Sequence, residues 1–187
     1  YAGKLICGRE TALCEVVDAI RRNRLPIEID VYTQSELQPK MRSWLEENTC
    51  RLYSSVSHEI MLERQKNSDV LLFLEDIDGK YADLARLSFS SKITDYLSSG
   101  KCIFAVGKGD IAPMRYFTAN DSAITASTRE ELDKKLFLLA DDTSVITEYA
   151  KKAAKCGITN HNREKISRIF DDTIKAMAQE YIKEGEL

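Results

Sequence analysis

Apolar and polar positions follow two patterns along this chain: short apolar runs, and longer segments whose apolar residues recur at helical spacing. Val70–Leu74 and Cys102–Val106 are apolar throughout, which is typical of strands buried on both faces of a parallel sheet. Residues 10–23 predict an amphipathic helix. The apolar side of that helix consists of Leu13, Val16, Val17 and Ile20.

The remaining segments alternate in the same way. Strands are predicted over 1–6, 27–33, 51–54, 70–74, 102–106 and 123–126. Helices are predicted over 10–23, 36–47, 57–65, 91–99, 142–156 and 162–183, with one more following Ser127 and Thr128. Pro39 leaves the start of the second helix open, Gly100 ends the fourth, and 157–161 is expected to join the last two.

This alternation predicts the α/β fold class, because helices of this length form right-handed crossovers between parallel strands. We expect a Rossmann-like, doubly wound parallel sheet of about six strands. Helices should cover both faces, with two extra helices at the C-terminal end. Ligands bind such sheets at the carboxyl ends of the strands. The loops at 3–9, 54–58, 75–92 and 107–114 are therefore the places where a site is expected.

Composition narrows the class of protein. The 187 residues fit one domain, 1–187, and the net charge of -3 provides no basic surface for nucleic acid. No apolar run approaches the roughly 18 residues of a membrane span. The five cysteines form no C-x-x-C pair and predict reduced, mostly buried thiols. His58 and His161 lie far apart and are expected to be surface or capping residues.

The densest polar signal is the stretch from Ser88 to Gly100, where a loop enters a predicted helix. The first turn of a helix offers unpaired amides and a partial positive charge, and Lys92 adds a cation for phosphate oxygens. Asp95 follows one turn later, where a carboxylate can accept the two ribose hydroxyls of a nucleotide. A serine-capped surface helix with a solvated lysine and aspartate explains the same residues equally well.

The order of these motifs resembles a known family. Ser68-Asp-Val-Leu-Leu, followed by Ser88-Phe-Ser-Ser-Lys-Ile-Thr-Asp-Tyr-Leu-Ser-Ser-Gly-Lys-Cys-Ile, is similar to the C-terminal, donor-binding domain of GT-B glycosyltransferases of the retaining group 1 type. Residues 1–9 resemble the first strand and loop of that domain, and Asn160-His-Asn before a long helix resembles its closing helices. The likeness spans nearly the whole chain. The sequence also starts within a strand pattern, so we expect further chain upstream.

The resemblance implies a catalytic pair of cations. Arg9 and Lys92 would contact the diphosphate of the donor, and Gly3 would let the backbone approach the phosphates or the reacting sugar. Asp95 would hold the ribose. The other implied contacts are Val56 and Ser57 with the base, and Ser90 and Ser91 with the phosphates.

Two departures from the family pattern concern the sugar and the phosphates. Many retaining members carry an acid eight residues before the Asp95 position, where this chain has Leu87. Glu75, Asp76 and Asp83 are possible substitutes, although we expect them to belong to a solvated acidic loop. Family members also often carry a lysine a few residues after the Arg9 position, where this chain has Thr11, Ala12 and Leu13. Lys4 and Lys108 are the other candidates to supply that positive charge.

The resemblance implies transfer from a UDP- or GDP-sugar, with retention, to a sugar or glycolipid acceptor that a preceding N-terminal domain holds. The resemblance also implies no cofactor and no metal, because the cations can stabilise the diphosphate instead. Asp76-Ile-Asp78 has the spacing of a metal-binding pair but belongs to a hydrophilic loop with several acids. The chain alone is expected to bind nucleotide weakly, to transfer no sugar, and to be cytoplasmic or peripheral to the inner membrane. The alternatives are a sugar-nucleotide epimerase-like protein and a non-enzymatic flavodoxin-like or receiver-like module.

Overall fold

A computed structural model describes residues 1–185, without the side chains of Ala82, Ala85 and 182–185. The strands are β1 (Ile29–Tyr32), β2 (Cys50–Tyr53), β3 (Val70–Leu74), β4 (Cys102–Val106) and β5 (Ile124–Ala126). The helices are α1 (Arg9–Arg22), α2 (Pro39–Glu47), α3 (His58–Lys66), α4 (Ala82–Ala85), α5 (Lys92–Ser98), α6 (Ala112–Ala119), α7 (Arg129–Asp141), α8 (Thr143–Asn160) and α9 (Arg163–Gly185). Strands and helices alternate as the sequence predicts, and the α/β class is confirmed.

The sheet is smaller than predicted. Among the described residues, β1 and β2 form one parallel pair, and β3, β4 and β5 form a second parallel sheet in that order. The predicted strand over 1–6 is wrong, because the chain pairs with β1 only around Ala2, where the Gly3 amide donates to the Tyr32 carbonyl. Further on, the Leu5 amide donates to the Ser35 side chain instead of a strand. The expected six-stranded sheet is therefore two sheets of two and three strands.

Two hydrophobic cores lie on opposite faces of these strands. The first core joins α1, α2 and α7 to one side of the strands, including Val31, Leu72 and Leu74. The second joins α5, α6 and α8 to the other side, including Leu71 and Phe73. Successive side chains of a strand point to opposite faces, so β3 is buried on both. Helices on both faces are confirmed.

Local sequence sets several helix boundaries. Pro39 occupies the first helical position of α2, where its missing amide costs no hydrogen bond. Ser57 and Thr128 cap α3 and α7 through side-chain oxygens, as predicted. Two expectations need correction. The loop predicted over 157–161 is mostly helical, because α8 continues to Asn160, and α6 is a helix that the sequence reading did not predict.

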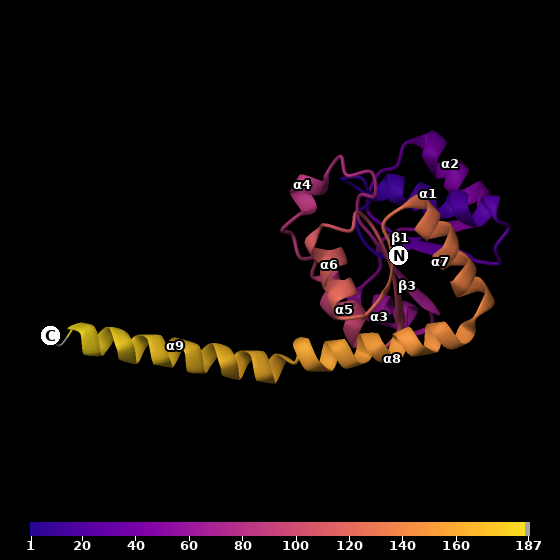
Figure 1. Ribbon diagram of the computed structural model, residues 1–187. Helices are drawn as coiled ribbons and strands as arrows, with labels where there is room; N and C mark the ends of the chain where they lie inside the picture. The colour runs from indigo at the N-terminus through magenta and orange to yellow at the C-terminus, as the bar shows by residue number, and fades with distance from the viewer. Residues whose placement is uncertain (186–187) are drawn as a thin grey trace.

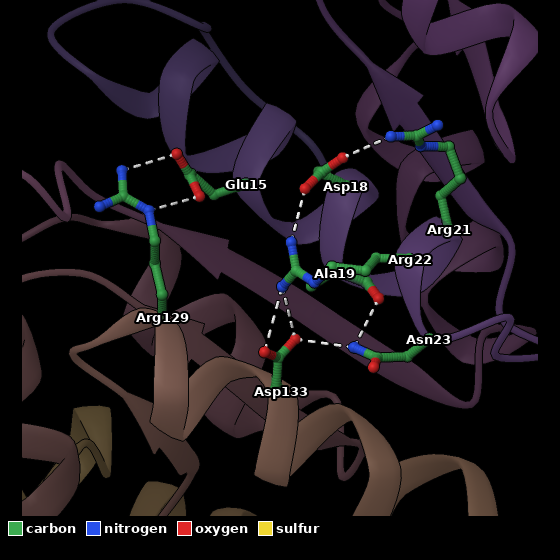
Figure 2. A network of polar contacts seen from close by, with 8 residues as sticks. All are labelled: Glu15, Asp18, Ala19, Arg21, Arg22, Asn23, Arg129 and Asp133. Carbon is green, nitrogen blue, oxygen red and sulfur yellow. Dashed lines mark hydrogen bonds and ion pairs between the residues drawn. The ribbon is translucent and has the colours of Figure 1, made fainter.

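Polar contacts join α1 to α7 along the outer surface of the first core (Figure 2). Arg22 donates to Asp133 at 2.8 Å, and Asn23 donates to the same carboxylate. Arg129 forms two hydrogen bonds with Glu15, at 2.8 and 2.7 Å. These side chains are all at least partly exposed to solvent, so each pair adds little to stability.

The last helix leaves the rest of the molecule. In Figure 1, α9 continues outward beyond the end of α8 and contacts no other element visibly. Its residues 163–181 are all exposed. Within the described part of the chain, no helix has both the length and the apolar character needed to cross a membrane.

Candidate functional site

Arg9 lies at the first position of α1, at the carboxyl edge of the strands, and is held by a buried acid. Its Nε donates to Glu75 Oε2 at 3.1 Å and its Nη2 donates to Oε1 at 2.9 Å. The Glu75 side chain is only 5% exposed. Burial alone would lower the pKa of Arg9, but the hydrogen bonds and charge of Glu75 outweigh it and raise that pKa. Both carboxylate oxygens of Glu75 are therefore committed to Arg9.

Lys92 lies at the first position of α5 and meets the N-terminal segment. Its Nζ is 3.4 Å from the Tyr1 hydroxyl and 4.7 Å from the centre of the Tyr1 ring. A Cβ added to Gly3 would lie 2.5 Å from that Nζ, so only glycine leaves room for the ammonium there. The structure thus brings together Gly3, Arg9 and Lys92, three residues predicted from the sequence.

The environment of Lys92 disfavours its charge. Burial and, to a lesser extent, the neighbouring Arg9 charge lower the pKa of Lys92, while Glu75 acts in the opposite direction, and the net result is a pKa of about 8. Among the side chains that the structure describes, Lys92 forms no ion pair. A half-buried ammonium without a carboxylate is unusual, because burying an unpaired charge is costly. A bound anion would remove that cost.

The acidic residues after β3 differ from expectation. Glu75 and Asp76 are buried, at 4% and 3% exposure, so the prediction of a solvated loop is wrong for both. The Asp76 carboxylate accepts a hydrogen bond from the Asp78 amide at 3.1 Å. The Asp76 side chain also lies against Gly8, where it leaves no space for a Cβ. Asp83 is exposed. Over the described residues, no three His, Cys, Asp or Glu side chains are grouped as metal ligands.

None of the hydrogen bonds described for the other predicted residues reaches this cluster. Val56 and Ser57 are exposed ahead of α3, and the Ser57 hydroxyl is used as the helix cap. Asp95 is exposed on α5. Ser90 is half-buried, and Ser91 is exposed at the start of α5.

The remaining candidates lie in solvent. Leu87, which stands where the family has an acid, is 85% exposed. Lys4 is exposed, and Lys108 lies 3.7 Å from Asp110. Two surface hollows lie elsewhere and contain none of the predicted site residues. One of about 330 Å³ lies at the junction of α8 and α9, and one of about 290 Å³ lies between α5 and the C-terminal end of α8.

The sequence reading missed two members of the cluster. Glu75 was grouped with the solvated loop, yet it comes directly after the buried run Val70–Leu74, which places it at the carboxyl edge of β3. That position was the available signal. Tyr1 carried no local signal, because its role depends on Lys92, 91 residues away in the sequence.

Known proteins resemble this chain in shape and not in sequence. No protein-family description and no curated protein matches the sequence. The structure of TarM matches with a TM-score of 0.66 at 11% identity, over 91% of this chain. The C-terminal domain of a glycosyl transferase group 1 family protein (LpcC) from Francisella tularensis matches with a TM-score of 0.62 at 10% identity, over 87% of this chain. WaaG, a glycosyltransferase involved in lipopolysaccharide biosynthesis, matches with a TM-score of 0.56 at 14% identity, over 85% of this chain.

The extent of each match shows what part of a protein this chain resembles. The chain spans 34% of the TarM chain and 42% of the WaaG chain, but 87% of the isolated LpcC domain. The fold is therefore that of the C-terminal domain of a GT-B glycosyltransferase.

Proposed function

We propose that this chain is the nucleotide-sugar-binding domain of a glycosyltransferase and that Lys92 is its principal phosphate-binding residue. The observation that carries the proposal is the half-buried Lys92 ammonium, which has Tyr1 and Gly3 beside it and no carboxylate partner among the described side chains. Gly3 leaves the room beside the backbone that this ammonium occupies. The fold shared with glycosyltransferase domains supports the same assignment.

The chemistry follows from where negative charge develops. When the sugar leaves a nucleotide-diphosphate donor, negative charge grows on the terminal phosphate. A cation fixed beforehand in a poorly hydrated site stabilises that charge more strongly than water does. Lys92 supplies the uncompensated charge. Arg9 keeps its position through Glu75 and supplies a second, largely neutralised cation.

The finer assignments are part of the same proposal. Asp95 would accept the ribose hydroxyls, Val56 and Ser57 would lie beside the base, and Ser90 and Ser91 would donate to phosphate oxygens. The donor would be a UDP- or GDP-sugar, used with retention and without a cofactor. A sugar or glycolipid acceptor would be held by a separate domain, so this chain alone would transfer no sugar.

The two alternatives gain no support from the site. An epimerase-like protein needs several free carboxylates around the donor, but Glu75 is used by Arg9 and Asp76 by loop amides. A receiver-like module needs an acidic cluster after its first strand. The loop after the N-terminal segment that pairs with β1 holds Cys7, Gly8 and Arg9, and the loop after β1 itself begins with Thr33, Gln34 and Ser35.

Calorimetric titration with UDP, GDP, ADP and their sugars tests the proposal. The wild-type chain should bind at least one nucleoside diphosphate. Lys92→Met should weaken that binding about 10- to 150-fold, the equivalent of a lost hydrogen bond to a charged group. Lys40→Met, at an exposed position of α2, is the matched control and should leave affinity unchanged. Equal affinity of wild-type and Lys92→Met chains, both folded by circular dichroism, would refute the assignment.

A further inference from the structure

The last helix carries an apolar stripe that the described part of the chain leaves uncovered. In Figure 1, α9 runs outward beyond α8, and residues 163–181 of this helix are all exposed. Large apolar side chains recur along it at helical spacing, so they share one face. They are Ile166, Ile169, Phe170, Ile174, Met177 and Tyr181. A contiguous exposed apolar surface of this kind marks an interaction site.

The charges on α9 favour a protein over a membrane as the occupant of this stripe. Over 163–181, four basic side chains are balanced by four acidic ones, so this part of the helix has no net charge. Helices that lie on membranes carry a polar face rich in lysine and arginine. The basic residues here are Arg163, Lys165, Arg168 and Lys175, and the acidic residues are Glu164, Asp171, Asp172 and Glu180.

The centre of the stripe has the spacing of a seam between two helices. Ile166, Phe170, Thr173 and Met177 follow one another in steps of four, three and four residues. This is the spacing of the a and d positions of a heptad, at which two helices pack side chains into each other. The stripe is therefore suited to pairing with another helix of the same length.

The two ends of the seam carry opposite charges. A further step of three residues in each direction reaches Arg163 before Ile166, and Glu180 after Met177. In a parallel pair of identical helices, each of these charges would face its own copy and repel it. In an antiparallel pair related by a two-fold axis, residue i of one chain faces residue j of the other, and j faces i. Arg163 then faces Glu180 at both ends of the pair.

We propose that α9 is a dimerisation helix, and that the stripe is covered by α9 of a second copy of this chain in antiparallel orientation. Ile166 packs against Met177 of the second copy, and Phe170 packs against Thr173. Because α9 extends beyond the rest of the molecule, the two bodies lie at opposite ends of the helix pair (Figure 1). The inference is independent of the proposed function, since none of these residues belongs to the candidate site.

The length of α9 sets the expected strength of the dimer. Its 23 residues span about 34 Å, because a helix rises about 1.5 Å per residue. A contact made by one helix from each copy lies at the small end of stable interfaces. We therefore expect a dissociation constant in the micromolar range.

Sedimentation equilibrium of the 187-residue chain over a range of concentrations tests the proposal. The wild-type chain should approach twice the mass of one chain as its concentration rises. Phe170→Glu places a charge in the middle of the seam and should weaken association at least about 10-fold. Gln179→Glu adds the same charge outside the stripe and should associate as the wild type does. Both positions are exposed, so both variants should keep the fold, which circular dichroism checks.

A charge exchange tests the antiparallel orientation. Arg163→Glu brings two acids together at each end of the pair and should weaken association about 5- to 30-fold. Glutamate in the first turn of a helix is favourable, so this variant should keep α9. Adding Glu180→Arg restores opposite charges and should recover wild-type association. Unchanged association of the single variant would overturn the antiparallel pairing.

Other results would overturn the choice of a second copy. A wild-type chain that stays monomeric at every concentration would contradict the proposal. Sedimentation of that monomer with phosphatidylserine vesicles would then assign the stripe to a membrane surface. A dimer that Phe170→Glu and Gln179→Glu weaken equally would lie elsewhere on the molecule, and α9 would not be its interface.

Discussion

The two ends of α1 use arginine in contrasting ways. At its C-terminal end, Arg22 pairs with Asp133 on the surface that joins α1 to α7, where both side chains are partly exposed to solvent (Figure 2). At its N-terminal end, Arg9 is held by the buried Glu75, and Lys92 lies nearby without a carboxylate among the described side chains. The surface pairs satisfy one another and need no ligand. At the carboxyl edge of the strands, Lys92 has no acidic partner among the described side chains, and this unpaired charge distinguishes a binding site from a structural contact.

Removing each acid in turn tests this contrast most strongly. Glu75→Ala leaves the Arg9 guanidinium partly buried without its partner. Breaking a buried pair in this way costs about 3–5 kcal/mol, and we expect about 2–4 kcal/mol because Arg9 retains some exposure. Glu15→Ala, which leaves the exposed Arg129 with Asp78 as its remaining partner, should cost less than about 1 kcal/mol. Urea denaturation measures both, and equal losses would remove the distinction between the two regions.

Gly3 tests the space around Lys92. Gly3 has a φ of +143°, and a Cβ there would lie 2.5 Å from Lys92 Nζ. Gly3→Ala should therefore cost about 1–3 kcal/mol in stability and also weaken nucleotide binding, because the ammonium must move. Gly100→Ala is the control, since Gly100 has a φ of +68° but open space for a Cβ. It should destabilise the fold and leave affinity unchanged; a parallel loss of affinity would contradict the account.

The pH dependence separates Lys92 from the paired arginines. The pKa of Lys92 is lowered from 10.5 to about 8, chiefly by burial. Between these values the unfolded chain keeps a proton that the folded chain has lost, so this group makes the free energy of unfolding rise as pH increases from 8 toward 10.5. Nucleotide affinity should fall over the same range, as the cation disappears. Both trends should be absent from Lys92→Met in denaturation and calorimetry at matched pH, and their persistence would assign them to another group.

The smallest effect is expected on the α1–α7 surface. Asp133→Ala removes the acceptor shared by Arg22 and Asn23. All of these side chains are at least partly exposed, so the loss should be below about 1 kcal/mol in denaturation and further reduced by salt. Nucleotide affinity should not change. A loss as large as that of Glu75→Ala would show that this surface is more than a solvated contact.

Elements with a strong local pattern could be predicted from the sequence. Val70–Leu74 and Cys102–Val106 are strands as expected. A short, continuous apolar run between two predicted helices is typical of a buried strand. The segment 1–6 could not be predicted in the same way. Its apolar residues suggested a strand, but it pairs with β1 only around Ala2, the Leu5 amide donates to the Ser35 side chain, and the chain then turns at Cys7 and Gly8, both with positive φ, to enter α1.

The site divides in a similar manner. Arg9, Lys92 and Gly3 are singled out through the family resemblance, and the structure places them close together, while their contact with a donor is a proposal. Glu75 could not be paired with Arg9 in advance, because the two residues are 66 positions apart and only the fold brings them together. Burial also changed the meaning of Glu75, from a solvated acid to the residue that neutralises Arg9.

The most direct test of the account is the titration of Lys92 itself. The chemical shift of its side-chain Cε, assigned by comparison with Lys92→Arg, reports its protonation by NMR with and without the nucleoside diphosphate that binds. The account predicts a midpoint near pH 8 in the free chain and a clear upward shift when nucleotide binds, because a phosphate beside the ammonium favours its charged form. A midpoint that saturating nucleotide leaves unchanged would contradict the central claim.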